Sequence, residues 1–190
     1  MEKLVQFDRE LFLTLNGWNN EAMDFLMYWV SDKFTWVPYY LLIAILIYKM
    51  FGRKTWLILP FAGLLIVFSD QSSVFFKNFF ERLRPCHDES ISDLVHTVKG
   101  HCGGKFSFVS SHATNTFALA TFIGGVFKPQ WKYFIYVMLF WAVLSSYSRI
   151  YLGVHYPADV FGGAVLGALI GTVMLLFYEL LAKKIYKNSL

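Results

Sequence analysis

Five long apolar runs constrain the fold of this chain more than any other feature of its sequence. Crossing the hydrocarbon core of a bilayer as a helix takes about 20 mostly apolar residues, and each run approaches or exceeds that length. Only 16% of the residues are charged, whereas a soluble domain has about 25%. The runs also lack the polar face that a surface helix of a soluble protein needs. We therefore expect an all-α integral membrane protein. The runs are 36–51, 55–80, 110–127, 132–148 and 158–181.

The N-terminal residues 1–35 differ from these runs because charges interrupt them. Apolar residues share a helical face on either side of "NGWNN", which predicts two amphipathic helices in the membrane interface, with an extra span as the alternative. The charges near the start of the chain do not fit the pattern of a secretory signal peptide. We therefore expect the first span to remain uncleaved. The predicted fold is a polytopic membrane helix bundle of five to six helices, with an interfacial segment, 1–35, and a membrane-embedded core, 36–190. The two apolar faces are Leu4, Phe7, Leu11 and Leu15, and Ala22, Phe25, Leu26, Trp29 and Val30.

Basic residues gather at alternate connections between the predicted spans. Alternate connections face the same side of a membrane, and basic residues favour the cytoplasmic side. The net charge of +4 therefore indicates topology, and we expect no nucleic-acid partner. The connections 82–108 and 148–157 then face the periplasm of a bacterial inner membrane. The eight basic residues are Lys49, Arg53, Lys54, Lys128, Lys132, Lys183, Lys184 and Lys187.

Three glycines share one face of the last run, namely Gly163, Gly167 and Gly171. Small residues at this spacing let a second helix approach closely. The second helix belongs either to the same chain or to another copy, so the oligomeric state stays open.

Polar residues of three short stretches fall on the predicted periplasmic side. In "KNFFERLRP", Lys77 and Arg84 share a helical face if the helix continues to Arg84, although Pro85 favours a helix that ends just before it. The alternative is that both cations only reach toward lipid headgroups.

The second stretch, "FVSSHATNTF", begins a predicted helix. Ser110 or Ser111 can cap its N-terminus, and the free N–H groups of such an end suit a phosphate. His112 lies in the first turn. The alternative is an ordinary capped helix with an incidental histidine.

The third stretch, "SRIYLGVHYPAD", joins the fourth and fifth runs. Arg149 lies at the end of one run, and Pro157 suits the first turn of the next. His155 and Asp159 are four residues apart, so the carboxylate can hold one imidazole nitrogen and leave the other free to attack. A structural histidine–aspartate contact is the alternative.

These groups together favour a phosphate site. An anion that needs three cations is most simply a phosphate, and two histidines can serve as nucleophile and general acid. The order and spacing of the motifs resemble the three-part signature of the type 2 phosphatidic acid phosphatase family, which vanadium haloperoxidases share. The middle motif of that family usually reads Pro-Ser-Gly-His, whereas this chain has Val-Ser-Ser-His at 109–112. The matching positions are Lys77, Arg84, Pro85, Ser110, His112, Ser148, Arg149, His155 and Asp159.

The resemblance implies a mechanism without a metal ion or cofactor. His155 would attack phosphorus and form a phosphohistidine, and Asp159 would orient it. His112 would protonate the leaving oxygen and then help to activate water. The phosphate oxygens would be held by Lys77, Arg84, Ser110, Arg149 and the N–H of Ser111.

The implied function is a lipid-phosphate phosphatase whose substrate enters sideways from the membrane, so the expected partners are a lipid phosphate and membrane lipids. Undecaprenyl diphosphate is the first substrate we expect, followed by lipid A phosphate, then by phosphatidylglycerol phosphate and phosphatidate. The alternatives of another class are a haloperoxidase and a non-enzymatic lipid transporter. Charges inside spans mark transport paths, but Asp70 is the one such charge deep within a run; it could pair with Lys77 or line the substrate's path.

Both cysteines, Cys86 and Cys102, lie in the predicted periplasmic connection, where disulfides persist. A disulfide here would contribute about 3 kcal/mol to stability and would anchor the loop beside Arg84. The alternative is a zinc site with His87 and His101, although adjacent Cys-His pairs lack the usual ligand spacing of such sites.

Overall fold

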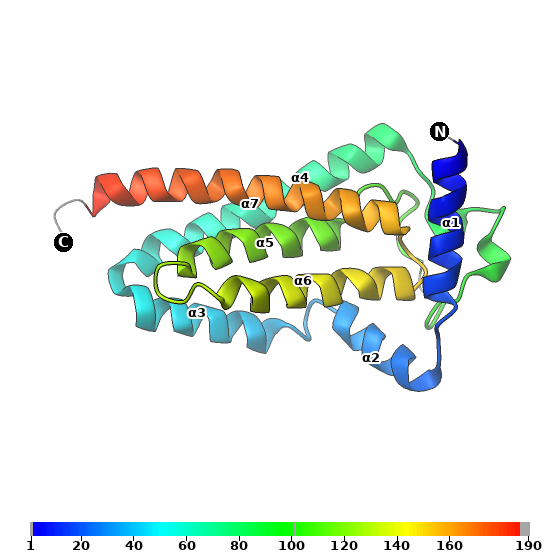
Figure 1. The fold of residues 1–190 in the computed structure, drawn as a ribbon, viewed down its shortest axis with the longest axis horizontal. Helices are drawn as coiled ribbons and strands as arrows, with labels where there is room; N and C mark the ends of the chain where they lie inside the picture. Colours follow the sequence, from blue (N-terminus) through cyan, green and yellow to red (C-terminus); the bar gives the residue numbers. More distant parts are fainter. Residues whose placement is uncertain (1, 101, 187–190) are drawn as a thin grey trace.

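Helices, joined by loops, make up the regular secondary structure of the part of the chain that the computed structural model describes, residues 2–100 and 102–186. The all-α class is therefore confirmed. Figure 1 shows the longer helices side by side along the molecule, with α1 lying across one end of the bundle. The helices are α1 (Glu2–Asn16), α2 (Glu21–Ser31), α3 (Val37–Phe51), α4 (Thr55–Phe80), α5 (Ser111–Phe127), α6 (Phe134–Tyr151) and α7 (Pro157–Ile185), with short 3₁₀ turns at Gly52–Lys54, Pro85–His87 and Ser92–Leu94.

The five apolar runs correspond to helices α3 to α7, with ends that differ by a few residues. Three segments, 37–80, 134–151 and 157–185, are long and apolar enough to cross a membrane. The first holds both α3 and α4, which meet at Gly52, where a positive φ of 52° ends α3. Helix α5 has 17 residues, and it packs against α4, α6 and α7. Helix α5 thus forms the centre of the bundle.

The glycine face of α7 packs against α5 within the same chain. A Cβ atom at Gly163 would lie 2.7 Å from the carbonyl oxygen of Ser110, and one at Gly171 would lie 2.6 Å from that of Ala118. Only glycine permits this approach. It brings the starts of α5 and α7 together, so that the N–H of Ser110 donates to the carbonyl oxygen of Asp159 at 3.0 Å.

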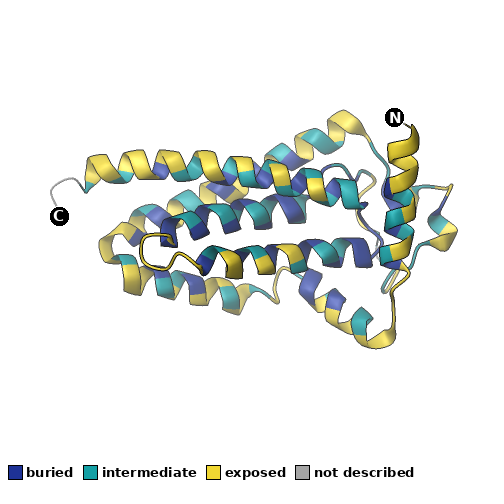
Figure 2. Cartoon of the chain, in the orientation of Figure 1, coloured by how far each residue is buried: buried dark blue, intermediate teal, exposed yellow. Residues whose placement is uncertain are grey.

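The outward faces of the bundle are exposed and apolar. Figure 2 shows exposed residues along the outer sides of the long helices and buried residues where the helices meet. A soluble protein rarely exposes so much contiguous apolar surface, so this surface fits the acyl chains of a bilayer. Exposed apolar side chains include Leu42, Phe75, Phe140, Leu169 and Leu180.

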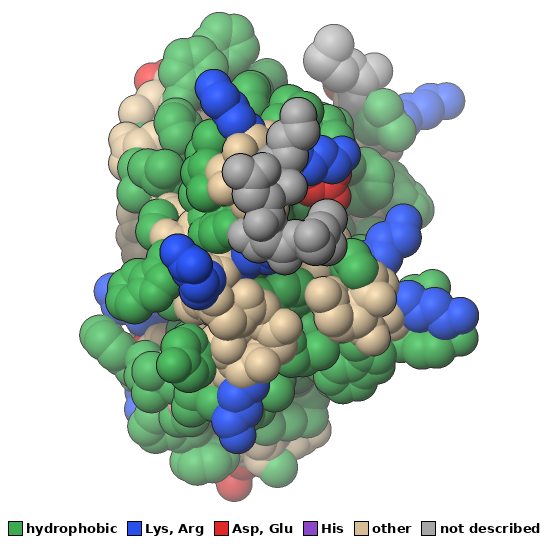
Figure 3. All heavy atoms as spheres, turned by 90° about the vertical axis from the view of Figure 1, so that its left-hand side faces the viewer, with side chains coloured by type: hydrophobic (Ala, Val, Ile, Leu, Met, Phe, Trp, Pro, Cys, Tyr) green, Lys and Arg blue, Asp and Glu red, His purple; other side chains and the backbone are tan. Residues whose placement is uncertain are grey.

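The two ends of the bundle differ in charge. The α3–α4 turn, the α5–α6 turn and the end of α7 lie together at the end opposite α1 (Figure 1). Figure 3 views this end and shows Lys and Arg side chains spread around it, with few acidic ones. Of the eight basic residues used to predict topology, Lys187 lies outside the described residues; the other seven lie in the last turn of α3, in these turns and in the last part of α7.

Helix α1 has an unusual distribution of side chains. Leu4 and Phe7 are 74% and 62% exposed, whereas Asp8, Phe12 and Asn16 on the opposite face are buried. The face toward the protein therefore carries two polar side chains, Asp8 and Asn16, beside the apolar Phe12, whereas Leu4 and Phe7 face outward. Such an arrangement suits a helix in contact with lipid, and its depth in the membrane stays a prediction.

Candidate active site

A cavity of about 400 Å³ lies at the α1 end of the bundle. Its walls come from the end of α2, the start of α3, helices α4, α5 and α6, and the connections that precede α5 and α7. Residues from all three polar stretches therefore meet there. Of the residues predicted for the site, Lys77, Arg84, Ser111, His112, Arg149 and His155 line the cavity.

Three cations give this cavity a positive charge. Lys77, near the end of α4, donates to the hydroxyl of Ser111, and Arg149, in the last turn of α6, donates from Nη1 to the hydroxyl of Ser31. The buried Nε of Arg149 has no hydrogen-bond partner within residues 2–100 and 102–186. No ion pair neutralises Lys77, Arg84 or Arg149 in the same part of the chain. An unneutralised cluster of this kind fits a phosphate.

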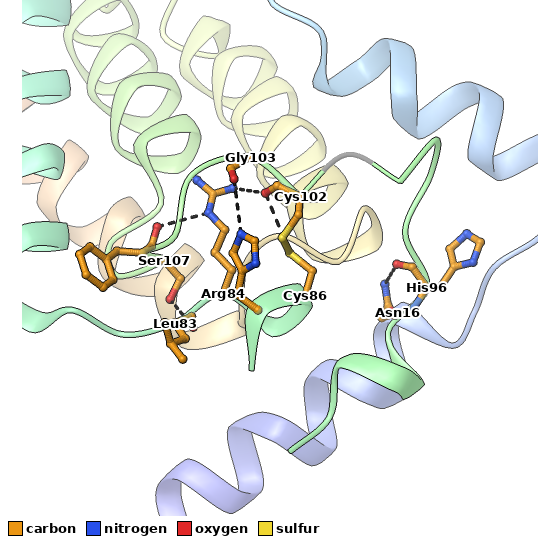
Figure 4. Close-up of a disulfide and its surroundings, with 10 residues drawn as sticks. Asn16, Leu83, Arg84, Cys86, His96, Cys102, Gly103 and Ser107 are labelled. Carbon is orange, nitrogen blue, oxygen red and sulfur yellow. Dashed lines mark hydrogen bonds between the residues drawn. A yellow bond between two sulfur atoms is a disulfide. The ribbon is translucent and has the colours of Figure 1, made fainter. Parts of the chain in front are cut away.

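Arg84 reaches the cavity from a loop, because α4 does not continue as far as Arg84. The helix ends at Phe80, and Glu81 adopts a left-handed conformation with φ of 48°. The chain then pairs back on itself, with Leu83 bridged to Phe106. Arg84 donates from Nη1 to the carbonyl oxygen of Cys102 at 3.0 Å and from Nε to that of Phe106 at 3.3 Å (Figure 4). Two backbone carbonyls thus orient the guanidinium.

A disulfide joins Cys86 to Cys102, with their Cα atoms 6.0 Å apart (Figure 4). The bridge fixes the same Cys102 whose carbonyl oxygen accepts from Arg84. With the two sulfurs bonded to each other, neither is a thiolate ligand for zinc. Of the two histidines in the zinc alternative, His87 lies 3.4 Å from the carbonyl oxygen of Gly103, and His101 falls outside the described residues.

His155 lines the cavity, and Asp159 lies next to it on the side away from the cavity. The Nδ1 atom of His155 is 3.5 Å from Oδ2 of Asp159, which is longer than a good hydrogen bond. Asp159 is fully buried. Its Oδ2 accepts from the N–H of Tyr156 at 2.8 Å, and its Oδ1 accepts from Arg82 at 2.9 Å. The carboxylate is therefore held from two sides.

The surroundings of His155 keep its imidazole neutral. Burial, and then the positive charges of Arg84, Arg149 and Lys77, lower the pKa of His155 well below its ordinary value of 6.5. A neutral imidazole has a free nitrogen lone pair, which is the form that can act as a nucleophile.

The start of α5 supplies the remaining predicted residues. His112 has its Nε2 atom 3.1 Å from the carbonyl oxygen of Ser31. Ser110 occupies the N-cap position without a capping hydrogen bond, and its buried hydroxyl is unpartnered among the described residues. Ser111 contacts both Lys77 and Ser73 through its hydroxyl. The N-terminus of α5 thus presents two hydroxyls and an imidazole.

Asp70 was expected either to line the substrate's path or to pair with Lys77. It lines the cavity. The other role, an ion pair with Lys77, is absent within the described part of the chain. Instead Asp70 accepts from the side-chain amide of Asn115 at 3.5 Å.

Arg82 and Asp8 also belong to this site, although sequence reasoning did not find them. Arg82 donates to Asp159, donates to Oδ2 of Asp8 at 2.6 Å, and places its guanidinium 4.0 Å from the ring centre of Tyr156. The other oxygen of Asp8 accepts from the N–H of Ala158 at 2.9 Å. Helix α1 therefore reaches the back of the Asp159 carboxylate. The available signal was the recurrence of Asp8, Phe12 and Asn16 at helical spacing, on the face opposite the apolar one.

An apolar groove of about 460 Å³ adjoins the positive cavity. The two share Lys33, Tyr40, Asn115 and Thr116 as lining residues. Beyond this boundary, the groove is lined mostly by aliphatic side chains of α3, α4 and α5. A larger cavity of about 940 Å³ lies near the opposite end of the bundle and contains none of the predicted site residues.

Comparison with known proteins gives concordant results. A family model described as the PAP2 superfamily matches residues 55–183. The lipid A 4'-phosphatases of Porphyromonas gingivalis and Bacteroides thetaiotaomicron are 39% and 40% identical to this chain, over 90% of it and over 72% and 76% of their own lengths. An undecaprenyl-diphosphatase of Sulfolobus acidocaldarius is 29% identical over 89% of this chain and 77% of its own length.

Among solved structures, a transmembrane PAP2 type phosphatidylglycerolphosphate phosphatase from Bacillus subtilis resembles this chain with a TM-score of 0.71 and 22% identity. The similarity covers 94% of this chain and 88% of that one. The two proteins therefore share a fold.

Proposed function

Because the chain belongs to the PAP2 superfamily and is a membrane phosphatase that acts on lipid substrates, we propose that it removes a phosphate from lipid A. The observation that carries this proposal is one cavity with three cations and two histidines, open to an apolar groove. The similarity to lipid A 4'-phosphatases supports lipid A as the substrate. It reverses the order expected from the sequence, in which undecaprenyl diphosphate came first.

The proposed location is a bacterial inner membrane, with the site facing the periplasm. Basic residues favour the cytoplasmic side, and they surround the end of the bundle opposite the cavity (Figure 3). The disulfide near the cavity also suits an oxidising compartment.

In the proposed first step, the phosphate lies among Lys77, Arg84 and Arg149, which offset its charge. Nε2 of His155 attacks phosphorus, because Nδ1 of the same ring faces Asp159. A phosphorus–nitrogen bond forms as the ester phosphorus–oxygen bond breaks. Asp159 stabilises the positive charge that develops on the imidazole. Positioning and charge stabilisation supply most of the catalysis in phosphoryl transfer.

The proton transfers are assigned to His112, which lines the same cavity. It gives a proton to the leaving oxygen in the first step. In the second step it takes a proton from water, which attacks phosphorus and breaks the phosphorus–nitrogen bond. The hydroxyl of Ser110 and the N–H of Ser111 are the remaining candidate donors to phosphate oxygens. Phosphate and the free enzyme result, without a metal ion.

The apolar groove is the proposed site for the acyl chains. It begins at the cavity and runs between α3, α4 and α5 toward the exposed flank of the bundle. A lipid could therefore keep its chains among apolar side chains while its phosphate reaches the cations.

Phosphate release from a panel of lipids tests this proposal. Purified protein is assayed with lipid A, undecaprenyl diphosphate, phosphatidylglycerol phosphate and phosphatidate, with and without a chelator, and with His155→Ala as the inactive control. We expect the highest kcat/KM on lipid A and no effect of the chelator. A higher kcat/KM on another lipid would overturn the substrate, and activity lost to the chelator and restored by one metal ion would overturn the metal-free mechanism.

A further inference from the structure

A third cavity, of about 180 Å³, lies beside the positive cavity and has no role in the proposed mechanism. Ser31 and Arg149 line both cavities, so the hydrogen-bonded pair that they form is the boundary between them. The third cavity is bounded by the end of α2, the connection before α5 and the turn between α6 and α7. Its other lining residues are Tyr28, Asp32, Val98, Leu152 and Val154.

The position of this cavity matches the side on which the leaving group departs. His112, the proposed donor of a proton to the leaving oxygen, lies 3.1 Å from the carbonyl oxygen of Ser31. The part of the substrate esterified to the phosphate therefore begins next to Ser31. From there it can extend past the Ser31–Arg149 pair toward the third cavity.

The lining of the third cavity suits a group that is neither a lipid chain nor a second phosphate. Tyr28 offers an aromatic surface and a hydroxyl, and Nζ of the exposed Lys99 lies 3.8 Å from its ring centre. Asp32 offers a carboxylate, which accepts from the N–H of Thr35 at 3.2 Å and can accept further hydrogen bonds. A carboxylate repels phosphate but accepts from hydroxyl groups, and an aromatic side chain supplies apolar contact with a polar handle.

From these features we infer that the third cavity binds the sugar ring that carries the scissile phosphate. The inference rests on the proposed function, because the phosphate of lipid A is esterified to a sugar. The cavity has about the volume of six liquid water molecules, which is room for one ring but not for an acyl chain. Tyr28 and Asp32 would then distinguish a sugar phosphate from phosphates on glycerol or on a prenyl chain.

The test compares two substrates in the same variants. Phosphatidate carries its phosphate on glycerol and has no sugar, so the readout is the ratio of kcat/KM for lipid A to kcat/KM for phosphatidate. We expect Tyr28→Ala to lower this ratio about tenfold, the size of effect that loss of one pocket contact commonly has. Asp32→Asn, which keeps an oxygen for Thr35, should lower it by a smaller factor.

The matched control is Phe25→Ala. Phe25 lies one turn before Tyr28 on α2, is 70% exposed and lines none of the three cavities. It should leave the ratio at the wild-type value. The melting temperature of Tyr28→Ala and its hydrolysis of phosphatidate show whether it folds. If it does not fold, the same ratio is measured in Tyr28→Phe and Asp32→Asn instead.

The outcomes separate the inference from the proposed function. A wild-type enzyme without a preference for lipid A contradicts both. A wild-type preference for lipid A that Tyr28→Ala and Asp32→Asn leave unchanged overturns the sugar site alone, as does an equal loss on both substrates in folded variants.

Discussion

His155 lies among positive charges that serve both binding and chemistry. Burial is the largest cause of the lowered pKa of His155, and the same three cations that can bind a phosphate lower it further. A histidine in this position stays neutral at pH values where an exposed histidine is largely protonated. The free nitrogen is therefore available before the substrate arrives.

This arrangement predicts the pH dependence of the reaction. Attack requires neutral His155, and protonation at low pH stops it. Because its pKa lies well below 6.5, we expect kcat/KM to persist as the pH falls below 6.5 and to decline only at more acidic values. Arg84→Gln removes one positive charge, so the pKa of His155 should rise and the acidic decline should move to higher pH in the residual activity.

The measurement is the profile of kcat/KM against pH for both proteins on the same lipid, so that ionisation of the substrate affects them equally. Arg84→Lys keeps the charge and serves as the control. Coincident acidic declines in wild type and Arg84→Gln would show that the charge of Arg84 does not control His155.

Motif order was enough to predict that the three cations and the two histidines would lie near one another, but not which residues they would contact. Ser31 lies outside every motif, yet its hydroxyl and its carbonyl oxygen contact Arg149 and His112. Ser111, which stands where the family usually has glycine, contacts Lys77 through its hydroxyl. Such contacts depend on how distant helices pack, which local spacing does not encode.

Among the elements, α1 contributes more than its amphipathic pattern predicted. Its apolar face predicts a position near the membrane surface. Its opposite face carries Asp8, whose partner Arg82 is 74 positions away in the sequence. Sequence periodicity identifies faces of a helix but not what each face contacts, so the link from Asp8 through Arg82 to Asp159 could not be predicted.

We expect Asp8→Asn to lower kcat about tenfold with little change in KM, because small losses of orientation at a reacting group are costly. The change keeps the shape of the side chain but removes the charge that holds Arg82 beside Asp159. Steady-state kinetics on lipid A measure both parameters.

Arg9→Ala is the matched control for this change. Arg9 is on the same helix and pairs with Asp88 at 2.8 Å, but it does not contact Asp159. If α1 acted only as a structural brace, the two variants would lose activity alike; a selective loss of kcat in Asp8→Asn supports a positioning role.

At the scale of the whole molecule, charge and apolar surface are segregated along the bundle. Basic residues surround one end (Figure 3), a cationic cavity lies near the other, and the exposed flanks between them are apolar (Figure 2). Composition and the five apolar runs were sufficient to predict this overall plan. The cavities themselves were not predictable, because each is lined by residues from several elements that are far apart in the sequence.

The cavities divide a phosphorylated lipid into parts. The positive cavity fits the phosphate and the apolar groove fits the chains. The small polar cavity, which adjoins the positive cavity at Ser31 and Arg149, is the inferred site of the sugar. Each boundary is formed by named residues, so the three parts of the proposal can be tested separately. The chemistry at the centre of the proposal is a single claim, which is that His155 receives the phosphoryl group.

Trapping the covalent intermediate tests that claim most directly. Lipid A with a radiolabelled phosphate is mixed with the enzyme, the reaction is quenched within a turnover under alkaline conditions that preserve phosphohistidine, and the labelled peptide is identified. We expect the label on the peptide that contains His155, and none in His155→Ala. Label on His112 instead, or phosphate release by the wild-type enzyme with no labelled peptide at any time, would contradict the account.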